Sequence, residues 1–272
     1  MPVPNVTMNN KVQIPQVGLG LWHMRDEAEC KAAVKTALDL GYTHFDTAQV
    51  YGNEAFLGEA LKEAGAKRKD LFITTKIWND NFWWDDIEPS LDESLEKLKT
   101  NYVDLLLLHF PVTETRGPAW RRMQDIYQSG KAKAIGVSNY TVRHLEELMA
   151  TSGVVPAVNQ IELHVYLQQP ELLDFCKQHD IVVEAYSPLA HGYGLDNAAL
   201  RTVAKKHSKS TAQIMLRWCI QQDTVVLPKS VTPERIKQNL ELFDFELDGD
   251  DMQQLASLEQ NLHTSWDPTH VQ

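Results

Sequence analysis

The segments LFITTKIW (residues 71–78) and VDLLLLHF (residues 103–110) are nearly continuous in apolar residues. A strand with one face in water would alternate apolar and polar residues, and neither segment does so. Near-continuous apolar runs are typical of parallel strands that are buried on both faces of a sheet. The two segments therefore predict an α/β protein built on a parallel sheet.

Comparable short apolar segments recur along the chain, and stretches with the 3.6-residue spacing of amphipathic helices lie between them. The eight predicted strands are Gln16–Leu21, His44–Ala48, Leu71–Trp78, Val103–Phe110, Ala134–Asn139, Ala157–Leu163, Val182–Leu189 and Thr224–Lys229. The helices predicted to follow them are Glu27–Leu40, Glu54–Ala64, Ile87–Lys99, Ala119–Ser129, Val142–Ala150, Pro170–Gln178, Ala198–Lys206 and Pro233–Leu240. Eight strands, each followed by a helix, predict a (β/α)8 TIM barrel.

Three segments lie outside these eight repeats. Two of them, Ala212–Gln221 and Asp250–Glu259, have helical spacing and predict extra helices. The third, Val6–Ile14, has Asn9-Asn10 in its middle and predicts an N-terminal β-hairpin that closes the lower mouth of the barrel. No linker or low-complexity stretch divides residues 1–272, so we expect one domain with the length of a complete barrel.

Composition and charge narrow the range of partners. The formal net charge of −11 argues against a nucleic-acid surface, because phosphate binding depends on clustered Lys and Arg. No apolar run approaches the roughly 20 residues that cross a bilayer, and the first residues do not resemble a secretory signal. Nor are the three cysteines, Cys30, Cys176 and Cys219, spaced for a disulfide framework or a zinc site. We expect a cytoplasmic monomer without a nucleic-acid, membrane or metal partner.

A doubly wound dinucleotide-binding fold is the competing α/β arrangement. The Gly-x-Gly pairs are Gly18–Gly20 and Gly192–Gly194, and neither opens a helix as the phosphate-binding turn of that fold must. A nucleotide bound by this chain is therefore expected to be held in another way.

Polar residues stand near the carboxyl ends of three successive predicted strands. Asp46 lies at the end of the second strand, with Tyr51 just beyond it. Lys76 and His109 lie near the ends of the third and fourth strands. Because barrel active sites are built at these ends, the four side chains are expected to converge on one mouth. Taken singly, each has a structural alternative, as a helix cap, a surface lysine or a packed aromatic ring.

Together these side chains can protonate a carbonyl oxygen. A free tyrosine has a pKa of about 10 and is a poor proton donor near neutrality. We expect the Lys76 ammonium to lower the pKa of Tyr51, and Asp46 to keep the lysine charged and oriented. Tyr51 can then protonate the oxygen as a hydride reaches the carbon, while His109 orients the substrate. This chemistry requires no metal ion.

Seven stretches spread over nearly the whole chain resemble the aldo-keto reductase family, including short bacterial members such as the 2,5-diketo-gluconate reductases. They are, in family order, GYTHFDTAQVYGNEAFLGEAL, LFITTKIW, VDLLLLHFP, AIGVSN, VNQIELH, YSPL and LPKSVTPERIKQN. The resemblance implies a TIM barrel that reduces carbonyl compounds with NADPH. The family's catalytic tetrad falls on the same four residues, Asp46, Tyr51, Lys76 and His109.

The resemblance also implies a cofactor site. The family's contacts to the nicotinamide amide fall on Ser138, Asn139 and Gln160, and the aromatic residue that stacks on the nicotinamide ring falls on Tyr186. Pyrophosphate contacts fall on Ser187 and Leu189. The residues matched to the adenosine-phosphate end are Lys229, Ser230, Val231, Arg235 and Asn239.

The residues matched to the adenosine-phosphate end also have the chemistry of a phosphate site. Thr232-Pro233 fits the cap and first position of a helix, and helix N-termini bind anions. Lys229 and Arg235 add two positive charges suited to the 2′-phosphate of NADPH. A capped surface helix is the alternative interpretation of LPKSVTPER.

The substrate pocket is implied by a further match, with three departures. Trp22, Trp78 and Phe110 match the family's aromatic walls around the reacting carbonyl. Phe110 replaces a common Trp and Leu21 a common small polar residue, and both positions touch the family's substrate mouth. Gln238 replaces a common Glu at the adenine end.

We therefore expect an NADPH-dependent reductase of small aldehydes and ketones, with keto sugar acids as a narrower candidate. The tail, Asn261–Gln272, is short, so we expect a pocket that is open at one side and has broad specificity. One alternative is a regulatory, cofactor-binding subunit of the same fold. Another is an aldolase that uses Lys76 to form a Schiff base.

Overall fold

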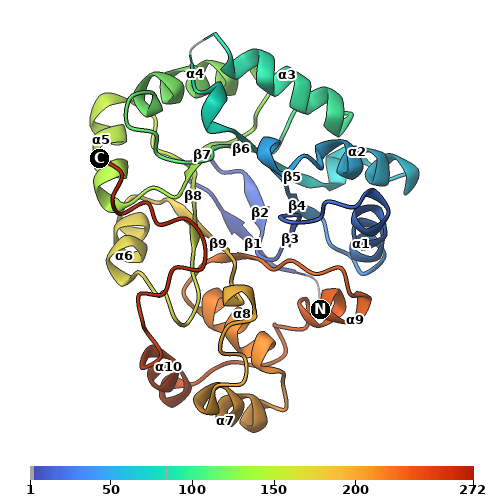
Figure 1. The fold of residues 1–272 in the computed structure, drawn as a ribbon, viewed down its shortest axis with the longest axis vertical. Helices are drawn as coiled ribbons and strands as arrows, with labels where there is room; N and C mark the ends of the chain where they lie inside the picture. Colours follow the sequence, from blue (N-terminus) through green and yellow to red (C-terminus); the bar gives the residue numbers. More distant parts are fainter. Residues whose placement is uncertain (1–2, 84) are drawn as a thin grey trace.

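A computed structural model describes residues 3–83 and 85–272, and its ribbon is shown in Figure 1. Eight parallel strands form one sheet, and each strand pairs with the strands next to it in the chain. The strands are β3 (Leu19–Gly20), β4 (His44–Asp46), β5 (Phe72–Ile77), β6 (Leu105–Leu108), β7 (Ile135–Ser138), β8 (Val158–Glu162), β9 (Val182–Tyr186) and β10 (Val225–Leu227).

Hydrogen bonds between the first and last strand regions close the sheet into a barrel. Val17 pairs in parallel with Val226, and the Gly18 amide donates to the Val226 carbonyl oxygen over 2.9 Å. A Cβ atom on Gly18 would lie 2.7 Å from Nδ1 of His44 and 2.8 Å from a methyl carbon of Leu227, so glycine permits this close approach. The predicted (β/α)8 barrel is confirmed.

The apolar run in β6 shows why both faces of a strand are apolar here. Leu105 and Leu107 belong to the cluster inside the barrel, whereas Leu106 and Leu108 belong to the core between the strands and the helices. All four leucines are fully buried. Successive side chains of a strand point to opposite faces. When both faces are buried, no position of the strand faces water, so polar residues do not alternate with apolar ones.

The N-terminal hairpin closes the lower end of the barrel, as predicted. Its strands β1 (Asn5–Thr7) and β2 (Gln13–Pro15) are antiparallel, with Val6 opposite Ile14. Met8 and Ile14 pack in the inner cluster with residues at the starts of the barrel strands. The side chain of Asn9 donates to the Pro156 carbonyl oxygen over 3.0 Å, which ties the hairpin turn to the barrel.

Helices are arranged around the strands (Figure 1). They are α1 (Glu27–Asp39), α2 (Glu54–Glu63), α3 (Ile87–Leu98), α4 (Arg116–Ser129), α5 (Val142–Thr151), α6 (Pro170–Gln178), α7 (Ala198–His207), α8 (Thr211–Gln221), α9 (Pro233–Gln238) and α10 (Gly249–Ala256). Within residues 3–83 and 85–272, no helix is both long enough and apolar enough to cross a membrane.

The helix that packs on the barrel between β9 and β10 is α8. Seven of its eleven residues are buried, and it contacts β10. α7 instead packs against α8 and α10 at the periphery of the molecule (Figure 1). The pattern predicted the reverse assignment, with Ala198–Lys206 on the barrel and Ala212–Gln221 as the extra helix, and this was wrong. Helical spacing identifies an apolar face but not the element that covers it.

Candidate active site

Three strand ends and one short turn bring the predicted tetrad together. Asp46 is the last residue of β4, Lys76 lies one residue before the end of β5, and His109 follows β6. Tyr51 ends the 3₁₀ turn Gln49–Tyr51, and the next residue, Gly52, has a φ of 71° that favours glycine. The turn places the phenol ring of Tyr51 near the carboxyl end of β4.

Lys76 is the centre of this group. Its ammonium donates hydrogen bonds to Asp46 Oδ1 over 2.7 Å, to the Thr47 carbonyl oxygen over 3.0 Å and to the Tyr51 hydroxyl over 3.2 Å. The lysine side chain is fully buried. Burial by itself lowers the pKa of Lys76, but the Asp46 carboxylate and Tyr51 outweigh burial, and the net pKa is raised. Lys76 is therefore a charged ammonium held against the phenol.

The pKa of Tyr51 departs from the sequence-based expectation. Burial raises it, and the opposing effect of Lys76, although present, is smaller, so the net pKa lies above that of a free tyrosine. The expected net lowering is wrong. At neutral pH the phenol keeps its proton, and Lys76 is placed to stabilise the phenolate once that proton has left.

His109 faces this pair as a neutral imidazole. Its ring centroid lies 5.7 Å from that of Tyr51. Burial, assisted by the Lys76 charge, holds the pKa of His109 well below its usual range. Nδ1 is buried without a hydrogen-bond partner among the described residues. Because an orphaned N–H is less tolerated than an orphaned lone pair, the hydrogen belongs on Nε2, which can donate to a carbonyl oxygen.

A buried polar chain lies behind the tetrad. Gln160 donates through Nε2 to Asp46 Oδ2 and to Glu184 Oε2, each over 2.9 Å. Glu184 is fully buried, and burial followed by the nearby Asp46 charge raises its pKa, which favours the neutral acid. Glu184 is not among the residues predicted from the sequence, although a glutamate inside the apolar strand VVEAY is a signal that could have found it.

One cavity of about 1050 Å³ joins the tetrad to the residues implied for the cofactor. Asp46, Tyr51 and His109 line it, while Lys76 lies buried behind them. All eleven residues matched to cofactor contacts also line this cavity: Ser138, Asn139, Gln160, Tyr186, Ser187, Leu189, Lys229, Ser230, Val231, Arg235 and Asn239.

The two ends of the cavity differ in chemistry. Near the tetrad, Asn139 donates to the His109 carbonyl oxygen over 3.0 Å and accepts from the Tyr186 hydroxyl over 2.7 Å. At the other end, the side chains of Lys229 and Arg235 are exposed. Within the described part of the chain, neither cation forms an ion pair with a carboxylate.

Aromatic rings surround the tetrad end of the cavity. Trp22 lines the cavity, with its ring centroid 4.8 Å from that of Tyr51. Trp78 and Phe110 do not line it directly. Trp78 packs on His109 with a centroid distance of 5.3 Å, and Phe110 packs on Trp266 at 6.1 Å.

Trp266, in the tail that follows α10, is a further aromatic wall that was not predicted from the sequence. Its ring centroid lies 5.5 Å from that of His109, 5.7 Å from that of Trp78 and 6.2 Å from that of Trp22. It lines the cavity although its side chain is partly exposed. The tail therefore contributes an aromatic side chain to the tetrad end of the cavity.

Two of the three departures from the family pattern can also be placed. Gln238 lines the cavity near Arg235, at the implied adenine end. Leu21 is fully buried in the apolar core, and its carbonyl oxygen accepts a hydrogen bond from Asn53. The expectation that Leu21 touches the substrate mouth is wrong. In the described residues, no three His, Cys, Asp or Glu side chains are placed to hold a metal ion together.

Comparison with known proteins identifies the family. The model of the aldo/keto reductase family matches residues 16–260. The chain is 41% identical over 266 residues to a glyoxal reductase of Bacillus subtilis, covering 98% of this chain and 96% of that protein. It is 42% identical over 259 residues to a methylglyoxal reductase of Escherichia coli O157:H7, covering 94% and 93%.

A solved structure agrees along the whole length of the fold. The crystal structure of an aldo-keto reductase from Bombyx mori in complex with NADP superimposes with a TM-score of 0.93 at 34% identity, covering 97% of this chain and 95% of that chain. The family match extends over most of the chain, and the relatives are matched along nearly their full lengths. The protein therefore belongs to the aldo/keto reductase family.

Proposed function

We propose that this protein reduces small aldehydes and ketones, α-dicarbonyl compounds among them, to alcohols with NADPH. As a member of its family it is an oxidoreductase that acts on carbonyl groups. The observation that carries the proposal is the Asp46–Lys76–Tyr51 hydrogen-bonded chain at the wall of a cavity that also contains every residue matched to cofactor contacts. The names of two relatives, glyoxal reductase and methylglyoxal reductase, suggest the dicarbonyl substrates.

The residues of the cavity fit NADPH. Ser138, Asn139 and Gln160 present polar groups near the tetrad, where they would hold the nicotinamide amide, and the ring of Tyr186 would stack on the nicotinamide. Gln160 uses its nitrogen on Asp46 and Glu184, which leaves its oxygen free to accept from that amide. Ser187 and Leu189 would lie along the pyrophosphate.

The far end of the cavity fits a second phosphate group. Lys229 and Arg235 reach it without a carboxylate partner among the described residues, and Ser230, Val231 and Asn239 line it with them. Unpaired cations beside hydroxyl and amide groups suit a phosphate ester. These residues would therefore bind the 2′-phosphate that distinguishes NADPH from NADH.

In the proposed reaction NADPH, when bound, supplies the hydride that reaches the carbonyl carbon. Tyr51 donates its proton to the carbonyl oxygen, and the Lys76 ammonium, 3.2 Å from the phenol oxygen, stabilises the phenolate that remains. Asp46 keeps the ammonium in place over 2.7 Å. His109, held neutral by burial, orients the same oxygen by donating from Nε2.

The walls of the pocket favour small, modestly polar substrates. Trp22 and Trp266 line the cavity beside the tetrad, and Trp78 and Phe110 pack against His109 and Trp266. Apolar walls with a few convergent polar groups are typical of sites for small organic molecules. Keto sugar acids are a narrower candidate, which a screen of NADPH consumption with several carbonyl compounds also tests.

We further propose that residues 1–272 act as one domain, because all groups of the site lie in one barrel.

The deciding experiment measures NADPH consumption with glyoxal, methylglyoxal, aromatic aldehydes, keto sugar acids and steroids. We expect turnover of the small aldehydes and dicarbonyls. Tight binding of NADPH without turnover of any carbonyl compound would contradict the proposal and favour a regulatory subunit. A bulky steroid as the sole good substrate would contradict the proposed substrate size.

A further inference from the structure

Glu162 is a buried carboxylate that the proposed proton transfer does not use. It is the last residue of β8 and only 3% exposed. Its two oxygens accept hydrogen bonds from the tail, more than one hundred residues farther along the chain. Oε1 accepts from the Thr264 backbone amide over 2.9 Å and from the Thr264 hydroxyl, and Oε2 accepts from the Ser265 amide over 3.1 Å.

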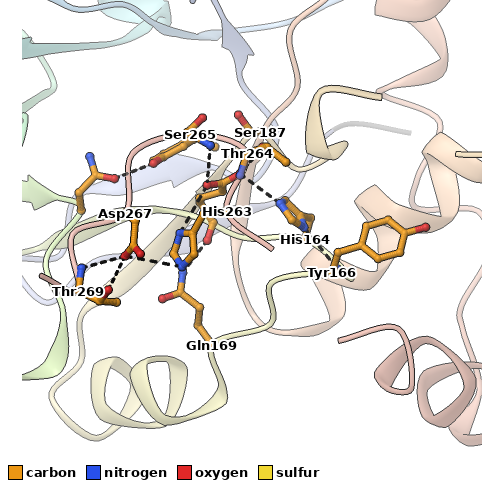
Figure 2. Close-up of polar contacts among 12 residues, drawn as sticks. His164, Tyr166, Gln169, Ser187, His263, Thr264, Ser265, Asp267 and Thr269 are labelled. Atoms are coloured by element: carbon orange, nitrogen blue, oxygen red, sulfur yellow. Dashed lines mark hydrogen bonds and ion pairs between the residues drawn. The ribbon is translucent and has the colours of Figure 1, made fainter. Parts of the chain in front are cut away.

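Two histidines complete the surroundings of this carboxylate, and Figure 2 shows both beside Thr264. His164 Nε2 lies 3.2 Å from Glu162 Oε1. His164 Nδ1 accepts from the Tyr166 amide, so the ring hydrogen is on Nε2 and donates to the carboxylate. His263 Nδ1 lies 3.9 Å from Oε2. Burial tends to raise the pKa of Glu162, but the hydrogen bonds from His164 and Thr264 outweigh it and lower the pKa, so the group is ionised.

These bonds determine where the next residue of the tail lies. With the amides of Thr264 and Ser265 fixed, Trp266 is directed onto the rings of Trp22, Trp78 and His109. Ser265 has a further contact, since its hydroxyl lies 3.2 Å from Nε2 of His191.

We propose that Glu162 is a positioning residue that latches the tail through Thr264 and Ser265, so that Trp266 forms a wall of the carbonyl pocket. The consequence for substrate binding rests on the proposed function, whereas the latch itself does not. A buried charge is costly, and apolar side chains of similar size would pack at least as well, so stability alone does not account for it. What the carboxylate provides is two acceptors for two successive backbone amides.

The chemistry of the latch suggests a conservative variant. Both oxygens of Glu162 accept backbone N–H groups. In Glu162→Gln, one of these positions becomes an NH₂ group that faces another donor. The variant has nearly the same volume but can accept only one of the two amide hydrogen bonds. Thr264→Val removes only the hydroxyl contact and is expected to have a smaller effect in the same direction.

The first readout is steady-state kinetics with methylglyoxal. Losing a hydrogen bond to a charged group shifts an equilibrium by about ten- to a hundred-fold. KM rises as the latched fraction falls, so Glu162→Gln should raise KM by about tenfold, with a much smaller change in kcat. The Kd for NADPH should remain near the wild-type value. Thr269→Val is the matched control in the tail. It removes a hydroxyl that donates to Asp267 and not to Glu162, so KM should stay unchanged.

A double-mutant cycle separates the latch from a general effect on the barrel. Trp266→Ala removes the wall itself and should also raise KM. If Glu162 acts through the tail, adding Glu162→Gln to Trp266→Ala should raise KM little further. A full additional tenfold rise in the double variant would show that Glu162 acts elsewhere and would overturn the proposal.

A readout independent of activity is chymotrypsin cleavage after Trp266, followed by mass spectrometry. Glu162→Gln should be cleaved about tenfold faster than wild type under native conditions, and Thr269→Val at the wild-type rate. Equal rates in Glu162→Gln and wild type, with equal KM, would overturn the latch. If the wild type reduces no carbonyl compound, the proposed function fails, while the cleavage rates still decide whether Glu162 holds the tail.

Discussion

The Lys76 ammonium donates a hydrogen bond to the Tyr51 hydroxyl over 3.2 Å, from a lysine side chain with no exposure to solvent. Burial raises the pKa of the phenol more than the lysine lowers it. Tyr51 therefore stays protonated before the reaction, and the lysine charge acts mainly on the phenolate that forms as the proton leaves. Interactions that strengthen in the transition state raise kcat rather than substrate affinity.

Tyr51→Phe tests the proposed proton donor. The substitution keeps the ring against Trp22 and deletes only the hydroxyl. General acid catalysis typically contributes about 10²–10⁴-fold, so kcat for methylglyoxal should fall on that scale. NADPH should still bind, with a Kd near the wild-type value when it is measured by quenching of Trp fluorescence. Near-normal turnover by Tyr51→Phe would show that another group supplies the proton.

Lys76→Met tests the buried ion pair. Lys76 and Asp46 are paired over 2.7 Å with almost no solvent exposure, so the variant leaves an unpaired buried carboxylate. Breaking such a pair from one side costs about 3–5 kcal/mol, which urea unfolding should detect. The kcat should also fall, because the phenolate that forms at Tyr51 loses the stabilising charge of the Lys76 ammonium. Lys76→Met/Asp46→Asn should recover part of the stability but not the activity. Unchanged stability in Lys76→Met would contradict this assignment.

The acid stability of the fold should depend on His44. This side chain is fully buried, and burial lowers its pKa from 6.5 to about 4. Below pH of about 6.5 the unfolded chain binds a proton that the folded chain does not, so stability present above that pH is lost as pH falls toward 4. The contribution is about 3 kcal/mol across this window.

The comparison that checks it is the free energy of unfolding of wild type and His44→Gln at several pH values between 7 and 4.5. His44→Gln is expected to be less stable at pH 7 but to lose less stability on acidification. Parallel pH profiles for the two proteins would assign the acid sensitivity to other groups.

Arg235→Ala tests the proposed recognition of the 2′-phosphate. Losing one charge-assisted hydrogen bond should raise the Kd for NADPH by about ten- to a hundred-fold and barely change the Kd for NADH. Lys237→Ala is the matched control, because Lys237 is exposed on the same helix, pairs with Glu241 and does not line the cavity. Equal wild-type affinities for the two cofactors, or parallel losses in Arg235→Ala, would contradict the assignment.

The architecture and the location of the tetrad could be predicted from the sequence because they depend on local patterns. Runs such as VDLLLLHF report burial on both faces, and parallel strands place their carboxyl ends at one mouth. The sequence therefore predicts that Asp46, Lys76 and His109 meet at that mouth. The resemblance added the cofactor residues, and all of them line one cavity.

Tertiary structure decided what depends on contacts between distant segments. The pairing of Glu162 with Thr264 and Ser265 has no signature in either segment, because the residues around a glutamate in a strand do not show which distant donors it will accept from. The net direction of the Tyr51 pKa shift is the difference between burial and the Lys76 charge, and burial depends on everything packed around the ring. Sequence by itself determined which groups reach the mouth of the barrel, whereas only the packed structure determined their protonation and the wall that covers them.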